Sequence, residues 1–142
     1  MWIVFALLAA LTAAVVVVLS KAGLEKVDPD LGFSIQAIFI VIIAWIATLF
    51  SGKFSTIYNI EKKAWIYLIA AGILTAVSSL LTFRALKLGN ASAVSPLERI
   101  SLVFAIVLAA IFLKEKLTWQ IILGALLMVG GAILIAVSSK SQ

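Results

Sequence analysis

Five long apolar runs make up most of this chain and decide what it can fold into. They cover residues 2–19, 33–50, 64–86, 93–113 and 119–137, with short polar connections between them. A helix needs about 20 apolar residues to cross the roughly 30 Å hydrocarbon core of a bilayer, and each run is close to that length. Helices also satisfy their own backbone hydrogen bonds, as lipid requires. The sequence therefore predicts an all-α membrane protein, a bundle of five transmembrane helices.

The composition provides few side chains that could carry out catalysis. The 142 residues are 65% hydrophobic and 12% charged, and they include neither Cys nor His. Thiolate nucleophiles, imidazole bases and the usual transition-metal ligands are thus missing. We expect no enzymatic activity, no metal site and no cofactor. The net charge of +5 comes from small clusters between the runs, which indicates contact with anionic lipid headgroups rather than nucleic acid.

The basic residues do not select one orientation in the membrane. If five spans alternate, the amino-terminal side holds Lys53, Lys62, Lys63, Lys114 and Lys116, and the other side holds Lys21, Lys26, Arg84, Lys87 and Lys140. Equal numbers on the two sides give no positive-inside bias. One explanation is insertion in both orientations, with two opposed copies forming a pseudo-symmetric pair. The other is a single orientation fixed by the insertion machinery or by a partner.

Small residues mark helix faces that can pack closely. Ala6, Ala10 and Ala14 repeat every fourth residue in the first span, and Gly124 and Gly131 are seven residues apart in the last. Small side chains let helix backbones approach one another in lipid. We expect the first span to be packed on at least one face. The last span can use its narrow face either between subunits or within one chain.

Two span starts carry recognisable cap residues. Asp28 followed by Pro29 is typical of an N-cap with proline at the first helical position, and Thr118 precedes Trp119 in the same way before the last span.

Polar side chains within the spans are the first candidates for a translocation path. Thr75, Ser78 or Ser79, and Thr82 form a line at helical spacing in the third span, and Gln36 and Ser101 lie in the second and fourth. We take Thr75, Ser79, Thr82 and Ser101 as candidate path-lining residues. Taken singly, each can instead bond to its own helix or a neighbouring one.

Glu98 and Arg99 stand side by side near the start of the fourth run, and two explanations fit them. In the first, Ser95 is an N-cap, Pro96 is the first helical residue and Glu98 completes a capping box near the membrane surface. In the second, the helix begins around residues 91–93 and carries both charges into the bilayer. A charge at the bilayer centre costs roughly 2.5 to 3.5 kcal/mol, so such charges mark transport sites. The second explanation makes Glu98 and Arg99 candidates for substrate binding or proton coupling.

Arg84 and Lys87 end the third span a short distance before this stretch. With Arg99 they place three positive charges against the one negative charge of Glu98. That surplus favours an anionic or zwitterionic substrate, or a lipid phosphate, so both residues are candidate anion contacts. Glu25, Asp28 and Asp30 are expected to form a solvated turn.

Several stretches together resemble a known family. They are FRAL at 83–86, LGNAS at 88–92, VSPL at 94–97 and FLKEKLT at 112–118, together with Gly124 and Gly131. Over nearly its whole length, and most clearly in these stretches, the chain is similar to the EamA-type domain of the drug/metabolite transporter superfamily. It resembles the short five-span group of bacteria and archaea. The resemblance implies a single domain over residues 1–142, equal to one half of a ten-span inverted-repeat transporter, in a prokaryotic inner membrane.

The resemblance implies a small secondary transporter of a metabolite or drug-like solute that works as an antiparallel homodimer. Related small multidrug transporters have a coupling acid in the first span. Residues 2–19 contain no acid, which leaves Glu98 as the proton-coupling candidate with Arg99 as its modulator or an anion contact. A non-transporting membrane subunit of a larger complex and a lipid-carrier flippase are the alternatives.

Overall fold

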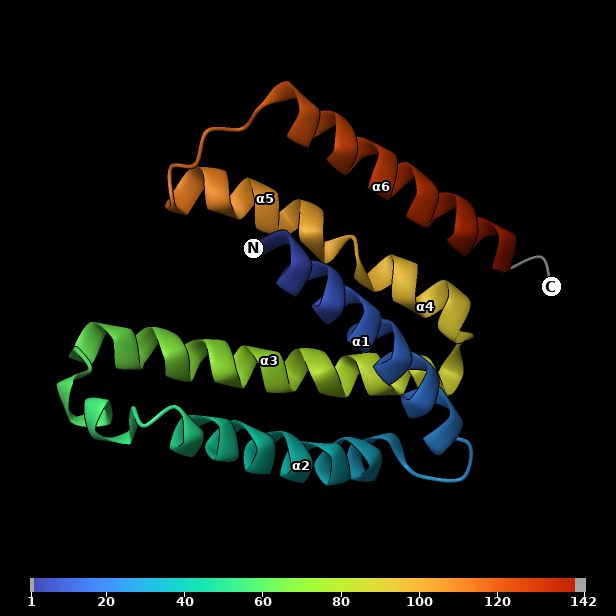
Figure 1. Ribbon diagram of the computed structural model, residues 1–142. Helices are drawn as coiled ribbons and strands as arrows, with labels where there is room; N and C mark the ends of the chain where they lie inside the picture. Colours follow the sequence, from blue (N-terminus) through green and yellow to red (C-terminus); the bar gives the residue numbers. More distant parts are fainter. Residues whose placement is uncertain (1, 140–142) are drawn as a thin grey trace. The chain divides into compact units, whose positions relative to one another are not determined.

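The computed structural model describes residues 2–139, and within them every regular element is a helix (Figure 1). The elements are α1 (Trp2–Gly23), α2 (Pro29–Phe50), the short 3-10 helix η1 (Phe54–Asn59), α3 (Lys62–Leu88), α4 (Ala91–Glu98), α5 (Ser101–Phe112) and α6 (Trp119–Ser139). Five helical stretches among the described residues are long and apolar enough to cross a membrane, with α4 and α5 together making the fourth. The predicted all-α membrane fold is confirmed. Lys140, counted above, lies outside the described residues.

Helices α2 and α6 begin at the predicted cap residues. Asp28 caps α2, its carboxylate accepting the N–H of Asp30 at 3.0 Å, and Pro29 occupies the start of the helix. Because of this cap, α2 begins four residues before the apolar run that predicted it. At the start of α6 the Thr118 carbonyl accepts the N–H groups of Ile121 and Ile122 at 3.0 and 3.2 Å, so this helix begins where expected.

The described chain divides into two compact units, and each is treated by itself. We call residues 20–87 the hairpin unit, and the described parts of residues 1–19 and 88–142 the second unit. In the hairpin unit α2 and α3 run antiparallel, with η1 in the connection between them (Figure 1). Phe33 and Phe83 meet edge-on near one end of the pair, their ring centroids 5.7 Å apart. Trp45 and Phe54 lie 5.8 Å apart between α2 and η1.

In the second unit the main packing is between α4 and α6. Ala93 in α4 and Ala125 and Ala132 in α6 are buried, so small side chains form the close contacts there. A side chain at Gly124 or Gly131 would meet nothing within 4 Å. Packing within the chain therefore uses the alanine that follows each of these glycines, and the glycine positions themselves stay open.

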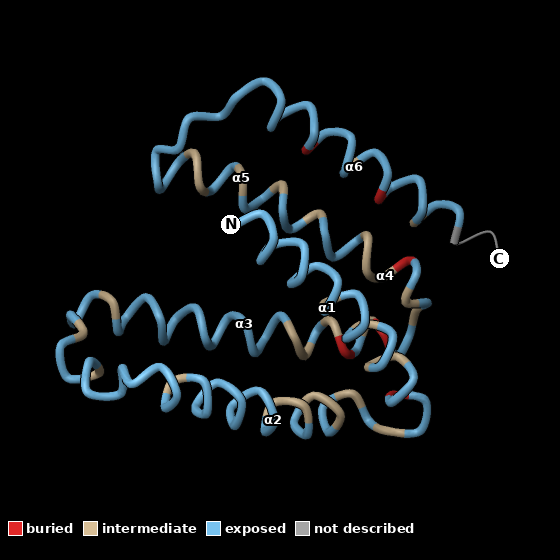
Figure 2. The backbone as a smooth tube through the Cα atoms, viewed as in Figure 1, coloured by how far each residue is buried: buried red, intermediate tan, exposed pale blue. Residues whose placement is uncertain are grey.

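Most of the apolar surface of the single chain is exposed (Figure 2). The buried hydrophobic residues are Leu24, Phe83, Leu86, Ala93, Ala125 and Ala132, and no described polar or charged residue is buried. Ala6, Ala10 and Ala14 are exposed as well. The expected packing of the first span is thus not found within the described chain. In a bilayer, lipid or a second protein must cover this surface.

The alanine contacts of α6 give a first testable prediction. Ala132 is only 5% exposed, so Ala132→Leu is expected to lower the free energy of unfolding by about 1–3 kcal/mol through overpacking. Thermal unfolding in detergent, followed by circular dichroism, measures the change. Ala105→Leu is the matched control, because Ala105 is exposed on α5. Equal melting temperatures for the two variants would contradict the packing described here.

Candidate functional site

The fourth span is interrupted, and the interruption carries the predicted charged pair. α4 ends at Glu98 and α5 begins at Ser101. Between them Arg99 has φ −68° and ψ −11°, and Ile100 has φ −58° and ψ −28°, values close to those of a 3-10 helix. The N–H of Ile100 bonds to the Leu97 carbonyl, and that of Leu102 to the Arg99 carbonyl, each three residues back. The backbone therefore tightens into a 3-10 turn inside the apolar span.

The start of α4 corrects the capping-box explanation. The helix begins at Ala91 after Asn90, whose carbonyl accepts the N–H groups of Ala93 and Val94 at 3.0 and 2.9 Å. Pro96 consequently lies inside α4, and Ser95 is not its N-cap. Instead, the Ser95 carbonyl accepts the N–H of Arg99 at 3.3 Å. Glu98 is thus the last residue of this helix and not part of its first turn.

The earlier start places the charges well inside the span. With a rise of 1.5 Å per residue, Glu98 lies roughly 10 Å along the helix from Ala91. Glu98, Arg99 and Ser101 are all exposed on the surface of the described chain. The interruption therefore places an acid, a base and a hydroxyl around one 3-10 turn within the fourth candidate span. Secondary transporters of other folds bind substrates and ions where a transmembrane helix is discontinuous.

The other candidate path residues belong to α3, in the hairpin unit. The Thr75 hydroxyl donates to the Ala71 carbonyl one turn earlier, at 2.8 Å. Such a bond satisfies the hydroxyl within its own helix. Ser79 and Thr82 are half-buried further along α3. Their part in a path stays a prediction.

Arg84, predicted as an anion contact, is held by a carboxylate. Its Nε and one terminal nitrogen donate to the two oxygens of Asp30 at 3.0 and 2.8 Å. The pair is bidentate and joins the end of α3 to the start of α2, with both side chains partly exposed to their surroundings. Asp30 was expected in a solvated turn; it is exposed, but it lies in the first turn of α2 and not in the connection before it.

Lys87 and Lys21 bind the carbonyl ends of each other's helices. The Lys87 ammonium on α3 donates to the carbonyls of Leu24, Glu25 and Val27, at 2.5, 3.0 and 3.3 Å, just beyond the end of α1. Lys21 on α1 donates to the Leu86 carbonyl of α3 at 2.5 Å. The last carbonyls of a helix lack partners within it, and a positive charge also interacts favourably with the negative end of the helix dipole. We call these contacts, together with the Arg84–Asp30 pair, the lysine clamp.

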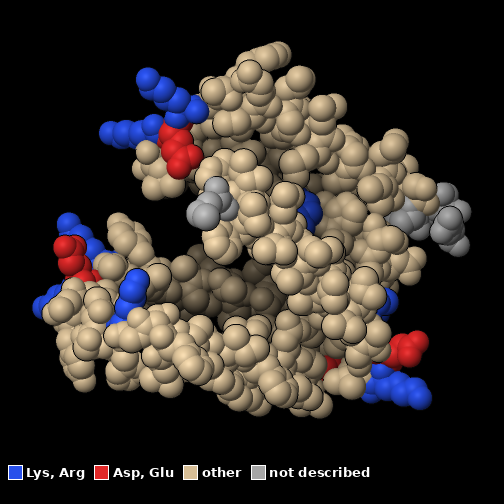
Figure 3. Space-filling view, viewed as in Figure 1, with Lys and Arg blue, Asp and Glu red and all other residues tan. Residues whose placement is uncertain are grey.

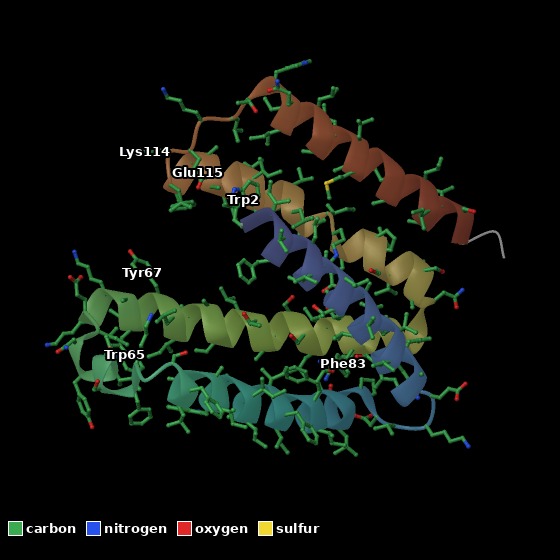
Figure 4. All side chains as sticks on the ribbon, in the orientation of Figure 1. Trp2, Trp65, Tyr67, Phe83, Lys114 and Glu115 are labelled. Carbon is green, nitrogen blue, oxygen red and sulfur yellow. The ribbon has the colours of Figure 1, made fainter. Side chains whose placement is uncertain are left out.

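Sequence reasoning missed Asp30 and Lys21 as parts of this arrangement. The expected antiparallel pairing of the second and third spans could have indicated Asp30, because antiparallel helices place the start of one beside the end of the other. Phe83, labelled in Figure 4 where α3 faces α2, shows the resulting register by its contact with Phe33. The same register brings Asp30 to Arg84.

The charges on the visible face lie in small groups separated by uncharged surface (Figure 3). One such group includes Lys114 and Glu115, in the connection between α5 and α6 (Figure 4). Among residues 2–139, no three side chains of the types that usually ligate metals come together.

Comparison with known proteins gives two relatives. A family model described as the EamA-like transporter family matches residues 1–137. An "uncharacterized transporter in cobO 3' region" of a Sinorhizobium species is 34% identical over 136 residues, 96% of this chain and 96% of that protein. An uncharacterized protein of Methanocaldococcus jannaschii is 36% identical over 87 residues, 61% of this chain and 64% of that protein. No solved structure gives a significant match.

Proposed function

Because the chain belongs to the EamA-like transporter family, we propose that it is a small secondary transporter for a metabolite or drug-like solute, working as an antiparallel homodimer. The observation that carries the proposal is the interrupted fourth span, which holds Glu98 and Arg99 at a 3-10 turn inside an apolar segment. Ionisable groups at this depth are costly unless they face a cavity or a partner. A path for an ion or a substrate would provide the cavity that these groups need.

Glu98 is the proton-coupling group in this proposal, and Arg99 modulates it or binds an anionic part of the substrate. A carboxylate that alternately binds a proton and releases it can couple solute movement to a proton gradient. Ser101, Thr75, Ser79 and Thr82 would line the path. Arg84 and Lys87 can contact a substrate anion only by exchanging Asp30 and backbone carbonyls for it.

Dimerisation is supported by the amount of uncovered apolar surface and by the balance of charge. Windows of the five candidate spans are between 0% and 11% buried in the single chain. The even distribution of Lys and Arg permits both orientations. We also propose that the two compact units are parts of one transmembrane domain in a prokaryotic inner membrane, since the family match extends through both units.

The transport proposal is tested with purified protein in liposomes. A panel of amino acids, nucleosides and aromatic cations is applied under an imposed proton gradient, and the current is recorded on a solid-supported membrane. At least one compound is expected to give a saturable current that protein-free liposomes lack. Failure of the whole panel, together with a stable complex with a foreign chain, would favour the non-transporting subunit instead.

The assembly is tested separately, by native mass measurement after detergent extraction. A homodimer is expected, and reporters fused to the two termini should each give signals on both sides of the membrane. A strictly one-sided signal would contradict the antiparallel pair, even if the dimer itself were found.

A further inference from the structure

A cleft in the hairpin unit is separate from the interrupted fourth span. It has a volume of about 200 Å³ and lies where the end of α1, the following connection, the start of α2 and the end of α3 meet. Leu24, Val27, Ile35 and Phe83 provide its apolar lining, with Ser20 and Gln36 as the polar groups. All of these residues lie within 20–87, so the cleft is complete in one compact unit.

The cleft holds a side-chain amide whose hydrogen-bonding capacity is largely unused. The Ser20 hydroxyl donates a hydrogen bond to the amide oxygen Oε1 of Gln36, over a long distance of 3.4 Å. Within residues 2–139, the two N–H groups of the amide have no protein acceptor. No described side-chain nitrogen or oxygen is both fully buried and unpartnered, so the amide nitrogen keeps some exposed surface, and Gln36 is one of the residues that line the cleft. In an apolar environment an unused donor is costly, and a bound acceptor relieves that cost.

Two positive charges at this end of the hairpin unit, those of Arg84 and Lys87, already have partners. Arg84 is paired with Asp30 through two hydrogen bonds, and Lys87 binds three backbone carbonyls. The residues that line the cleft include no Asp, Glu, Lys or Arg. A charged ligand would find no counter-ion here. An uncharged ligand with a hydrogen-bond acceptor matches both the amide and the apolar walls.

We propose that this cleft binds a small uncharged molecule that has an apolar body and a carbonyl-type acceptor, such as a ketone, ester or amide. The Gln36 amide donates to the acceptor, and Leu24, Ile35 and Phe83 enclose the body. The volume suits a ligand somewhat larger than benzene, since a cavity of about 150 Å³ lined by similar residues holds benzene. The proposal concerns binding alone and does not depend on transport through the fourth span.

Acetophenone is the probe, with ethylbenzene and benzoate as matched compounds. Ethylbenzene keeps the ring and the side-chain length but has no acceptor, and benzoate adds a charge. The full-length protein in lipid nanodiscs is titrated, while NMR follows the Gln36 side-chain amide and the Phe83 ring. Acetophenone is expected to shift both signals saturably. Ethylbenzene should bind about ten-fold more weakly, as loss of one hydrogen bond predicts, and benzoate should not bind.

Two variants test the assignment of roles. Gln36→Leu keeps the size of the side chain but removes the donor, so acetophenone should bind no better than ethylbenzene. Gly32→Val should abolish binding of both, because a Cβ at Gly32 comes 2.8 Å from Leu24 Cδ2 and 3.6 Å from the Phe83 ring. Gly72→Ala is the control, since Gly72 does not line the cleft and a Cβ there meets nothing within 4 Å. Its affinity should equal that of the wild type.

Two results would overturn the proposal. The first is equal affinity of the wild-type protein for acetophenone and ethylbenzene. This test does not depend on the folding of any variant. The second concerns lipid, whose ester carbonyl has the same acceptor chemistry. If exchanging ester phospholipids for ether phospholipids shifts the Gln36 amide, and acetophenone has no effect in either lipid, a lipid carbonyl occupies the cleft and no free solute does.

Discussion

Glu98→Gln is expected to reduce proton-driven flux to the background of protein-free liposomes while leaving the fold intact. Glutamine has nearly the same shape as glutamate but cannot bind and release a proton. Because Glu98 ends α4 inside an apolar span, replacing it with a neutral amide should not make insertion more costly. The measurement is the current from the substrate found in the panel, at equal amounts of reconstituted protein.

Glu115→Gln is the matched control for this experiment. Glu115 lies in the connection between α5 and α6, outside the spans, and the same change there should leave the flux at the wild-type level. Wild-type flux in Glu98→Gln would remove this carboxylate from the mechanism. Substrate exchange that is retained but no longer depends on the proton gradient would support the coupling role proposed for Glu98.

Lys87→Met is expected to loosen the lysine clamp. Methionine keeps much of the apolar stem but removes the ammonium group, which leaves the carbonyls of Leu24, Glu25 and Val27 without this donor. Because the side chain of Lys87 is exposed, we expect a loss of about 1.5 kcal/mol in the free energy of unfolding, the lower end for hydrogen bonds to a charged group. Thermal unfolding in detergent measures the loss, and hydrogen exchange should rise in residues 24–28.

Lys62→Met removes a lysine from the opposite end of α3 and serves as the control. Lys62 is exposed at the start of that helix, so its replacement should change neither the melting temperature nor the exchange of residues 24–28. Identical behaviour of the two methionine variants would show that the contacts of Lys87 add nothing measurable to stability.

The spans could be predicted from the sequence because lipid imposes a simple rule on length and polarity. The break between α4 and α5 could not. Arg99 and Ile100 keep right-handed helical dihedrals, and the change is only a shift from hydrogen bonds four residues back to bonds three residues back. That shift leaves the apolar run from Ser101 to Leu113 uninterrupted, so the hydropathy of the sequence does not indicate the break between the two helices.

The candidate site shows a similar division. Glu98 and Arg99 were identified because charge is rare in an apolar run, and the start of α4 then decided between their two explanations. The surroundings of Arg84 and Lys87 were not predicted. Asp30 is 54 residues from Arg84 in the chain, and only the hairpin register brings the two together. The acceptors of Lys87 are backbone carbonyls, which every residue has and no sequence pattern marks.

The unequal lengths of the helices have a consequence for how the protein sits in its membrane. α3 has 27 residues and α6 has 21. At 1.5 Å per residue, α3 is about 40 Å long, which exceeds the roughly 30 Å hydrocarbon core. The ends of α3, which carry Lys62, Lys63, Arg84 and Lys87, therefore extend into the headgroup layer, or the helix is tilted. A change in bilayer thickness should therefore act first on α3 and on the clamp at its carboxyl end.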